Sequence, residues 1–338
     1  RTLLALSPLL LLAACSGGST PTTQEPEPTA PDERDERPIE ATSLLGEPLY
    51  RPELPPEREA ELQANLEAAM TAQEADPESE EAIVWVGRRL AYLGQYRDAY
   101  TTFQWGLEKH PDSYRLLRHA GHRSITLRHF DQAVAELTRA AELMPAEPLE
   151  TEPDGAPNAL NIPLSSTQFN VWYHLGLAHY LNGDLEQALA AYERCLETSV
   201  NPDLLVATTD WMYMTLRRLG RHEEAAALLE PITADMEIIE NDAYHRRLLM
   251  YKGEVAPEEL LDLRAVNDPD QALAIATQGY GVGNWYLVEG DEARAREIFE
   301  AIVDGTSWAA FGYIAAEADL ARMNEAQEAA ADGAGGDV

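Results

Sequence analysis

Positive charge is scarce in this sequence. Only 25 lysines and arginines stand against 59 aspartates and glutamates in 338 residues, so the formal net charge is −34. This balance argues against nucleic acid as a general partner, because phosphate contacts need a basic face. It also argues against electrostatic attraction to an anionic lipid surface. Solubility or adaptation to high salt is a sufficient explanation of the acidity.

Cysteine and the common catalytic motifs are also scarce or missing. The two cysteines, Cys15 and Cys195, are too few for a disulfide framework. Cys195 stands where equivalent parts of the chain have a small residue, so we expect a packed thiol there. No GxSxG, HExxH or CxxC motif occurs, and no Ser/His/Asp pattern has a supporting context. We therefore expect no enzymatic activity and no cofactor.

Two short patterns resemble functional sites but lack what such sites need. Gly279, Gly281 and Gly283 resemble a phosphate-binding loop, yet no lysine follows at the spacing of a P-loop. Close packing of a helix explains these glycines better. His119 and His122 share one helical face, but no acid or cysteine at ligand spacing completes a metal site. We therefore expect no metal.

A short apolar run lies at the start of the chain. Residues 2–14 are interrupted only by Ser7 and Pro8 and are too few for a comfortable membrane span, so they are typical of a signal-peptide core. The letters LAAC that end at Cys15 resemble the lipobox of bacterial lipoproteins. The resemblance implies a signal peptide over residues 1–15, lipidation of Cys15, and a place in the cell envelope at the outer membrane, facing the periplasm.

Two segments have the composition of disordered chain. Residues 16–38 contain many prolines and charges and almost no large apolar side chain, so they cannot bury enough surface to fold. We predict a disordered acidic linker over residues 16–52. The last residues are rich in alanine, glycine and aspartate, and we predict a disordered tail over residues 326–338.

The rest of the chain repeats with a period of 34 residues, seen first in residues 80–113. Matching residues at this interval are Gly87 with Gly121, Ala99 with Ala133, Phe103 with Leu137, and Pro111 with Pro145. Apolar residues at helical spacing predict two helices in each unit, joined by a turn near Gly94. The small residues allow two helices to approach closely, the large ones fill the space between them, and the proline ends the second helix.

This pattern closely resembles the tetratricopeptide repeat (TPR). The resemblance implies an all-α, right-handed solenoid of about six helical hairpins over residues 53–325, with a capping helix at each end, the first over 56–75. Residues 146–168 are an insertion between the second and third repeats. Loops of this length in compact domains are usually functional or disordered, and its leucines indicate packing, so we expect it to fold across one face and narrow the groove.

The resemblance also implies where a partner binds. In TPR proteins the first helices of successive repeats line a concave groove, and here that stripe is rich in arginine and tyrosine, which suit binding hot spots and carboxylates. The predicted groove residues are Arg88, Tyr92, Arg115, Arg118, His122, Tyr173, Tyr180, Arg217, Arg218, Arg247, Tyr251, Tyr280 and Asn284. The alternative is that these side chains are solvated or paired with acids of the same chain.

Together these features predict a non-catalytic, lipid-anchored periplasmic scaffold that binds a peptide or a partner protein in its groove. The membrane would be reached only through the lipid anchor, and nucleic acid would not be a partner. In plan the chain resembles envelope TPR lipoproteins that recruit hydrolases or assemble outer-membrane proteins. Two alternatives stay open: a glycan-binding lipoprotein that uses the groove tyrosines, similar to SusD-type proteins, and an enzyme that uses residues 146–168 as a lid.

Overall fold

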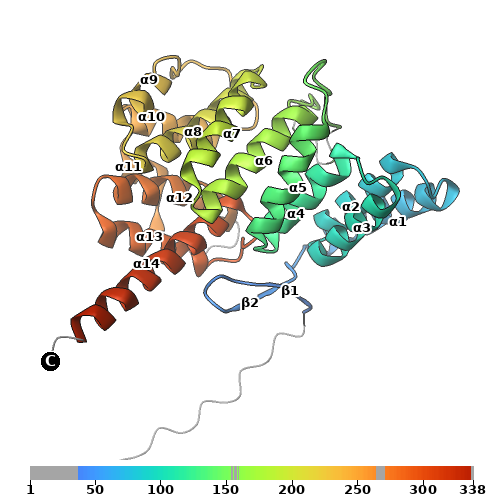
Figure 1. Cartoon of the computed structure of the whole chain (residues 1–338), viewed down its shortest axis with the longest axis horizontal. Coiled ribbons are helices and arrows are strands. Elements are labelled where there is room, and N and C mark those ends of the chain that lie inside the picture. Colours follow the sequence, from blue (N-terminus) through green and yellow to red (C-terminus); the bar gives the residue numbers. More distant parts are fainter. Residues whose placement is uncertain (1–36, 154, 156–157, 159, 264–270, 336–338) are drawn as a thin grey trace, which may run out of the picture. The chain divides into compact units, whose positions relative to one another are not determined.

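Helical hairpins follow one another along the chain (Figure 1). The computed structural model describes residues 37–153, 155, 158, 160–263 and 271–335. Within these residues the hairpins are α2–α3 (Glu80–Tyr92 and Tyr96–Lys109), α4–α5 (Tyr114–Thr126 and Phe130–Leu143), α6–α7 (Thr167–Asn182 and Leu185–Glu197), α8–α9 (Pro202–Arg218 and His222–Leu228), α10–α11 (Asp242–Tyr251 and Pro257–Leu260) and α12–α13 (Ala272–Val288 and Glu292–Val303). The predicted all-α solenoid of about six hairpins is confirmed.

Glycines let the two helices of a hairpin touch. A Cβ atom added to Gly87 would lie 2.3 Å from the ring of Phe103, which is closer than real atoms approach. The same contact recurs between Gly121 and Leu137, between Gly176 and Tyr192, and between Gly283 and Phe299. A side chain at any of these positions would push the helices apart. The structure therefore confirms the predicted roles of the small and large residues.

The turn inside each hairpin uses a left-handed residue. Glycine supplies it in five hairpins, at Gly94, Gly183, Gly220, Gly253 and Gly290. In the α4–α5 hairpin the residue is Arg128, with φ at 67°. A side chain in this region costs about 1–2 kcal/mol, so contacts made by Arg128 must offset that strain.

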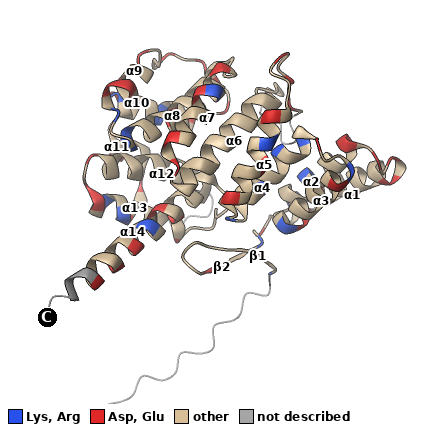
Figure 2. Ribbon diagram, viewed as in Figure 1, with Lys and Arg blue, Asp and Glu red and all other residues tan. Residues whose placement is uncertain are grey.

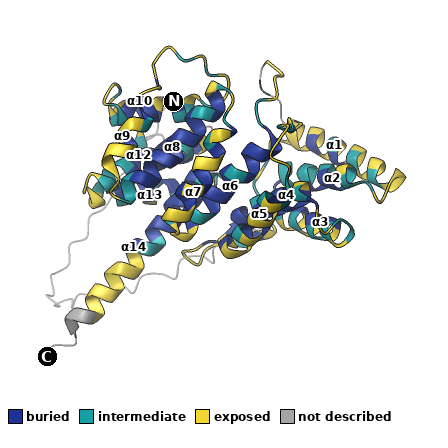
Figure 3. Cartoon of the chain, turned by 45° about the horizontal axis from the view of Figure 1, so that its top comes forward, coloured by how far each residue is buried: buried dark blue, intermediate teal, exposed yellow. Residues whose placement is uncertain are grey.

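The two ends of the described chain differ from each other. Helix α1 (Pro56–Ala75) buries Leu62 and Leu66 against α2, as expected of an N-terminal cap. Helix α14 (Phe311–Gly335) packs on α12 and α13 and then projects with an exposed end, drawn yellow in Figure 3. No helix among the described residues is long and apolar enough to cross a membrane.

Two predicted disordered segments are corrected by the structure. Strands β1 (Ile39–Thr42) and β2 (Pro48–Tyr50) form an antiparallel hairpin, so the linker cannot extend to residue 52. The hairpin is held because the buried Glu40 carboxylate accepts hydrogen bonds from Arg51 at 2.8 Å and from the Arg97 amide at 3.0 Å. At the other end α14 continues to Gly335 through the predicted tail, because alanine and glutamate favour helix.

The C-terminal segment returns to the N-terminal half of the unit. The buried Glu317 carboxylate accepts hydrogen bonds from Arg128 at 2.7 and 3.1 Å and from the Leu44 amide at 2.6 Å. The Trp308 indole donates to the Tyr50 carbonyl at 2.8 Å. We call this group of contacts the latch. It joins residues up to 273 positions apart, and the final helix is therefore more than a cap on the last hairpin.

Candidate functional site

The insertion between α5 and α6 is closed at its base. Glu152 donates its amide to the Ser165 carbonyl at 3.0 Å, and Thr167 donates its amide to the Glu150 carbonyl at 2.8 Å. The Gln168 side chain adds hydrogen bonds to the carbonyls of Pro145 and Pro148. We call the described residues of 146–168 the strap. Because its two ends meet at an isolated antiparallel bridge between Thr151 and Ser166, the strap leaves the solenoid and returns to it at one place.

The strap crosses the first helices of the N-terminal repeats. Its contacts are Glu152 with Arg118 at 3.0 Å, Glu150 with Arg115 at 2.8 Å, the Gly155 carbonyl with Arg89 at 3.2 Å, and Asn158 with Glu240 at 2.6 Å. These partners lie on α2, on α4 and just before α10. The described part of the strap therefore folds across one face of the solenoid, in agreement with the expectation from the sequence.

Two hollows flank the strap on this face. The first, which we call the cleft, has a volume of about 520 Å³ between α2, α4 and the strap and is lined by Val84, Trp85 and Arg115 among others. The second, which we call the cavity, has a volume of about 350 Å³ between the strap, α4, α6, α8 and Phe311. Arg88 and Arg118 line both hollows, so the two are adjacent.

The arginines around these hollows are unequally paired. Arg118 is buried against Glu152, but Arg88 contacts only the Tyr92 hydroxyl, at 3.3 Å, and the Trp85 ring, at 4.5 Å. No carboxylate among the described residues lies within ion-pair distance of Arg88. Arg123 is buried over Tyr96, and burial lowers its pKa to about 10. Acidic residues are spread over most helices in Figure 2, and Glu80, Glu81 and Glu150 also line the cleft. Arg88 is therefore distinguished by the lack of a carboxylate partner among the described residues, and not by an excess of positive charge on this face.

Three histidines of this face, which we call the inner histidines, are uncharged at neutral pH: His119, His122 and His174. Burial, and then the charges of neighbouring arginines, hold their pKa values well below the usual one. The rings of His122 and His174 are 4.4 Å apart, and Phe311 lies 5.2 Å from the first. His119 instead stacks on Phe103. Among the described residues no three metal-ligating side chains gather in a suitable geometry.

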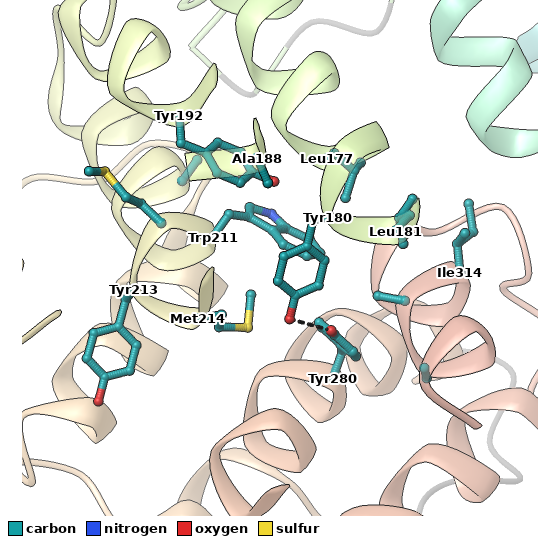
Figure 4. Packing of buried hydrophobic residues seen from close by; sticks show 14 of the residues in the cluster. Leu177, Tyr180, Leu181, Ala188, Tyr192, Trp211, Tyr213, Met214, Tyr280 and Ile314 are labelled. Carbon is teal, nitrogen blue, oxygen red and sulfur yellow. Dashed lines mark hydrogen bonds between the residues drawn. The ribbon is translucent and has the colours of Figure 1, made fainter. Parts of the chain in front are cut away.

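The predicted groove residues of the C-terminal half are bound by the chain itself. Arg218 pairs with Asp319 of α14 at 2.5 Å, and Arg247 pairs with the fully buried Asp210 at 2.5 Å. Tyr280 donates to Tyr180 at 2.7 Å, the bond drawn in Figure 4. Asn284 is fully buried and accepts from Arg218. Burial opposes the charge of Arg218, but Asp319 and the neighbouring tyrosines raise its pKa well above the usual value.

The remaining groove residues divide between the two ends. Arg217 is paired with Glu289 at 2.7 Å, and Tyr251 stacks on Tyr213, so neither lies in the cleft or the cavity. The structure brings together at these hollows only part of the predicted set, namely Arg88, Arg115, Arg118, His122 and Tyr173, with Tyr92 beside Arg88. Whether any of them binds a partner stays a prediction, and Cys15 lies outside the described residues.

Several residues of the site escaped sequence reasoning. Trp85, His174 and Phe311 line the hollows but were not in the predicted set. Glu150 and Glu152 hold the strap on the arginines, and the two acids of the insertion were the available signal. No sequence pattern indicated that Phe311 lines the cavity, because it belongs to α14, near the C-terminal end of the chain.

The described chain belongs to the class of helical-hairpin solenoids, and the strap covers part of its inner surface. The tetratricopeptide repeat family matches residues 169–199, which cover most of α6 and all of α7. This hairpin therefore matches the tetratricopeptide repeat by sequence, and it lies within a solenoid whose described residues form six helical hairpins. No curated protein has a sequence that matches this chain significantly.

Solved structures resemble the chain at low sequence identity. YrrB, described as a TPR protein with an unusual peptide-binding site, is 16% identical with a TM-score of 0.38, over 71% of this chain and 92% of YrrB. A tetratricopeptide repeat protein from Parabacteroides merdae ATCC 43184 is 14% identical with a TM-score of 0.43, over 77% of this chain and 93% of that protein. MamA from AMB-1 is 18% identical with a TM-score of 0.39, over 51% and 88%.

Proposed function

We propose that this protein is a non-catalytic scaffold that holds a segment of a partner protein on the inner face of its solenoid, at the cleft between α2, α4 and the strap. One observation carries the proposal: the cleft presents Arg88 beside the half-buried ring of Trp85, and no described carboxylate pairs with it. Arginine and tryptophan are enriched among residues that dominate binding energy. An acidic side chain of a partner would form an ion pair with Arg88.

The charged groups of the interior support a binding role over a catalytic one. Asp210 is held by Arg247, Asp319 by Arg218, and Glu317 by Arg128, so each of these three buried acids is engaged in an ion pair that joins separate parts of the fold. Such pairs specify an arrangement of helices and leave no acid of this group available for proton transfer.

We further propose that the chain is anchored by lipid at Cys15 and faces the periplasm from the outer membrane. The support is the apolar run of residues 2–14 that ends at LAAC. Acyl chains on Cys15 would give stable anchoring without a membrane-spanning helix. Cys15→Ser should move the protein from the detergent phase to the aqueous phase in a phase-partition assay. A variant that stays in the detergent phase would reject lipidation of Cys15.

The binding proposal is tested by capture of partners from detergent-solubilised envelopes. Arg88→Glu should reduce the captured partner at least about tenfold, because reversal of a charge inside an interface replaces attraction by repulsion. Arg88 forms no ion pair with a described residue, so the fold of the variant should be unaffected.

Arg139→Glu is the matched control. Arg139 also lies on a helix but is half-exposed on α5 and pairs only with Asp112. A partner whose capture is the same with wild type, Arg88→Glu and Arg139→Glu would reject the cleft as its binding site.

A further inference from the structure

The cavity behind the strap has the construction of a ligand site. Its volume of about 350 Å³ falls within the range of about 300–1,000 Å³ found for small-molecule pockets. One wall is polar and carries Arg88, Arg118 and His174. The other is apolar and carries Phe169 and Phe311 with further apolar side chains, Leu164, Leu204 and Ala207. Polar and apolar side chains around one cavity suit a ligand with a polar head and an apolar body.

The charges of the polar wall call for an anion. Arg118 is already paired with Glu152 at 3.0 Å, and its Nε has no hydrogen-bond partner although it is buried. Arg88 has no carboxylate partner among the described residues. Glu240 also lines the cavity, but it is exposed and accepts a hydrogen bond from Asn158. Among the described residues, the charge of Arg88 at the junction of cleft and cavity is therefore not paired with a carboxylate.

The neutral groups of the same wall supply orientation. His174 donates from Nδ1 to the carbonyl of Asn170, so its neutral ring keeps Nε2 as an acceptor. No described residue donates to that nitrogen. His174 is 4% exposed as a residue and lines the cavity, so a ligand held there can reach this acceptor. A ligand that carries an N–H or O–H beside its acid group would satisfy it.

From this geometry we propose that the cavity binds a carboxylate attached to an apolar or aromatic body. The carboxylate pairs with Arg88, the body lies between Phe169, Leu204 and Phe311, and a donor next to the carboxylate reaches His174 Nε2. This proposal extends the proposed function by naming a chemical group that the inner face binds. The group comes either from a free organic acid or from the C-terminal residue of a partner chain, and only the second source rests on the proposed function.

Isothermal titration calorimetry with the full-length chain tests the proposal directly. N-acetyl-phenylalanine has a carboxylate, an N–H beside it and an aromatic ring, whereas N-acetyl-phenylalaninamide has the same body without the charge. The acid should bind at least about tenfold more tightly than the amide, because a charge-assisted hydrogen bond is lost in the amide. Equal affinity of the two compounds, or no heat from the acid at millimolar concentration, would overturn the proposal.

A peptide arm distinguishes the two sources. Acetyl-Ala-Ala-Phe with a free C-terminus extends the same group into the adjoining cleft. Tighter binding of this peptide than of N-acetyl-phenylalanine assigns the cavity to a partner's C-terminal residue, and equal or weaker binding assigns it to a free acid. Because these probes need no partner, a failed partner capture with successful calorimetry rejects the proposed function alone.

Two variants locate the bound acid. Arg88→Met should weaken binding of the acid at least about tenfold and leave the amide unchanged, while Arg139→Met should change neither. Ala207→Leu places a larger side chain in the apolar wall and should weaken acid and amide together. Circular dichroism checks that each variant is folded. In an NMR titration, the ring signals of His174 should shift on binding, because the ligand donates a hydrogen bond to Nε2. An unchanged His174 signal at saturating acid would place the ligand elsewhere.

Discussion

Replacement of Arg128 by glycine gives opposite results for two explanations of this residue. If Arg128 serves only as a turn residue, glycine should stabilise the protein by about 1 kcal/mol, because the strain of a left-handed side chain disappears. If the latch requires its charge, glycine should destabilise the protein. The sign of the change therefore decides between them.

The magnitude follows from the contacts of the latch. Glu317 is 0% exposed and would keep only the Leu44 amide as partner in Arg128→Gly. Removal of one member of a buried ion pair costs about 3–5 kcal/mol. The Arg128 guanidinium also donates to the carbonyls of Thr126 and Trp308 and lies 5.5 Å from the Trp308 ring. After subtraction of about 1 kcal/mol of relieved strain, a net loss of about 2–4 kcal/mol remains.

Urea unfolding followed by circular dichroism at helical wavelengths measures this loss. The midpoint for Arg128→Gly should fall, and the double variant Arg128→Gly/Glu317→Gln should recover part of the loss because no buried charge is left unpaired. A single variant as stable as wild type, or more stable, would refute the idea that the latch contributes to stability.

Three further results are expected. As pH falls from 7 to 5, the free energy of unfolding should decrease by up to about 1.4 kcal/mol per pH unit for each inner histidine. The pKa values of these histidines are low in the folded protein, so the unfolded chain takes up protons that the folded chain does not. A urea midpoint independent of pH would contradict this. Gly87→Ala should cost about 1–3 kcal/mol through overlap with Phe103, and a second change, Phe103→Leu, should restore part of it in thermal melts. Arg247→Met should cost about 3–5 kcal/mol because Asp210 would be left buried without its partner, whereas Arg139→Met on the surface should change stability by less than about 1 kcal/mol.

The sequence predicted the repeat interior well. The 34-residue interval identified Gly87 and Phe103 as a contacting pair, because close helix packing restricts residue size at fixed positions. The predicted cap over residues 56–75 coincides with α1, since its apolar spacing and Pro55–Pro56 define the helix start. Local rules of this kind depend on residues that are near in sequence or related by the repeat.

What covers the inner face could not be predicted in the same way. The expectation that the first helices of the repeats line the groove identified Arg218 and Arg118 as inward-facing. It does not predict which acidic residue forms an ion pair with each of them. Asp319 comes from a helix 101 residues further along the chain, and Glu152 from an insertion that no repeat pattern describes. The β1–β2 hairpin was missed for a similar reason, since its short strands are held by Arg97 and Trp308 and have little apolar pattern of their own.

The latch also has a mechanical consequence. Any pull on the chain before residue 37 enters the unit at the β1–β2 hairpin, which is fastened to α14 through Leu44–Glu317 and Tyr50–Trp308. These hydrogen bonds would therefore be the first to carry the tension. Until they break, helices α1 and α2 would not be pulled apart. The resistance of this end of the unit to tension would then depend on Arg128, a single arginine in a strained turn.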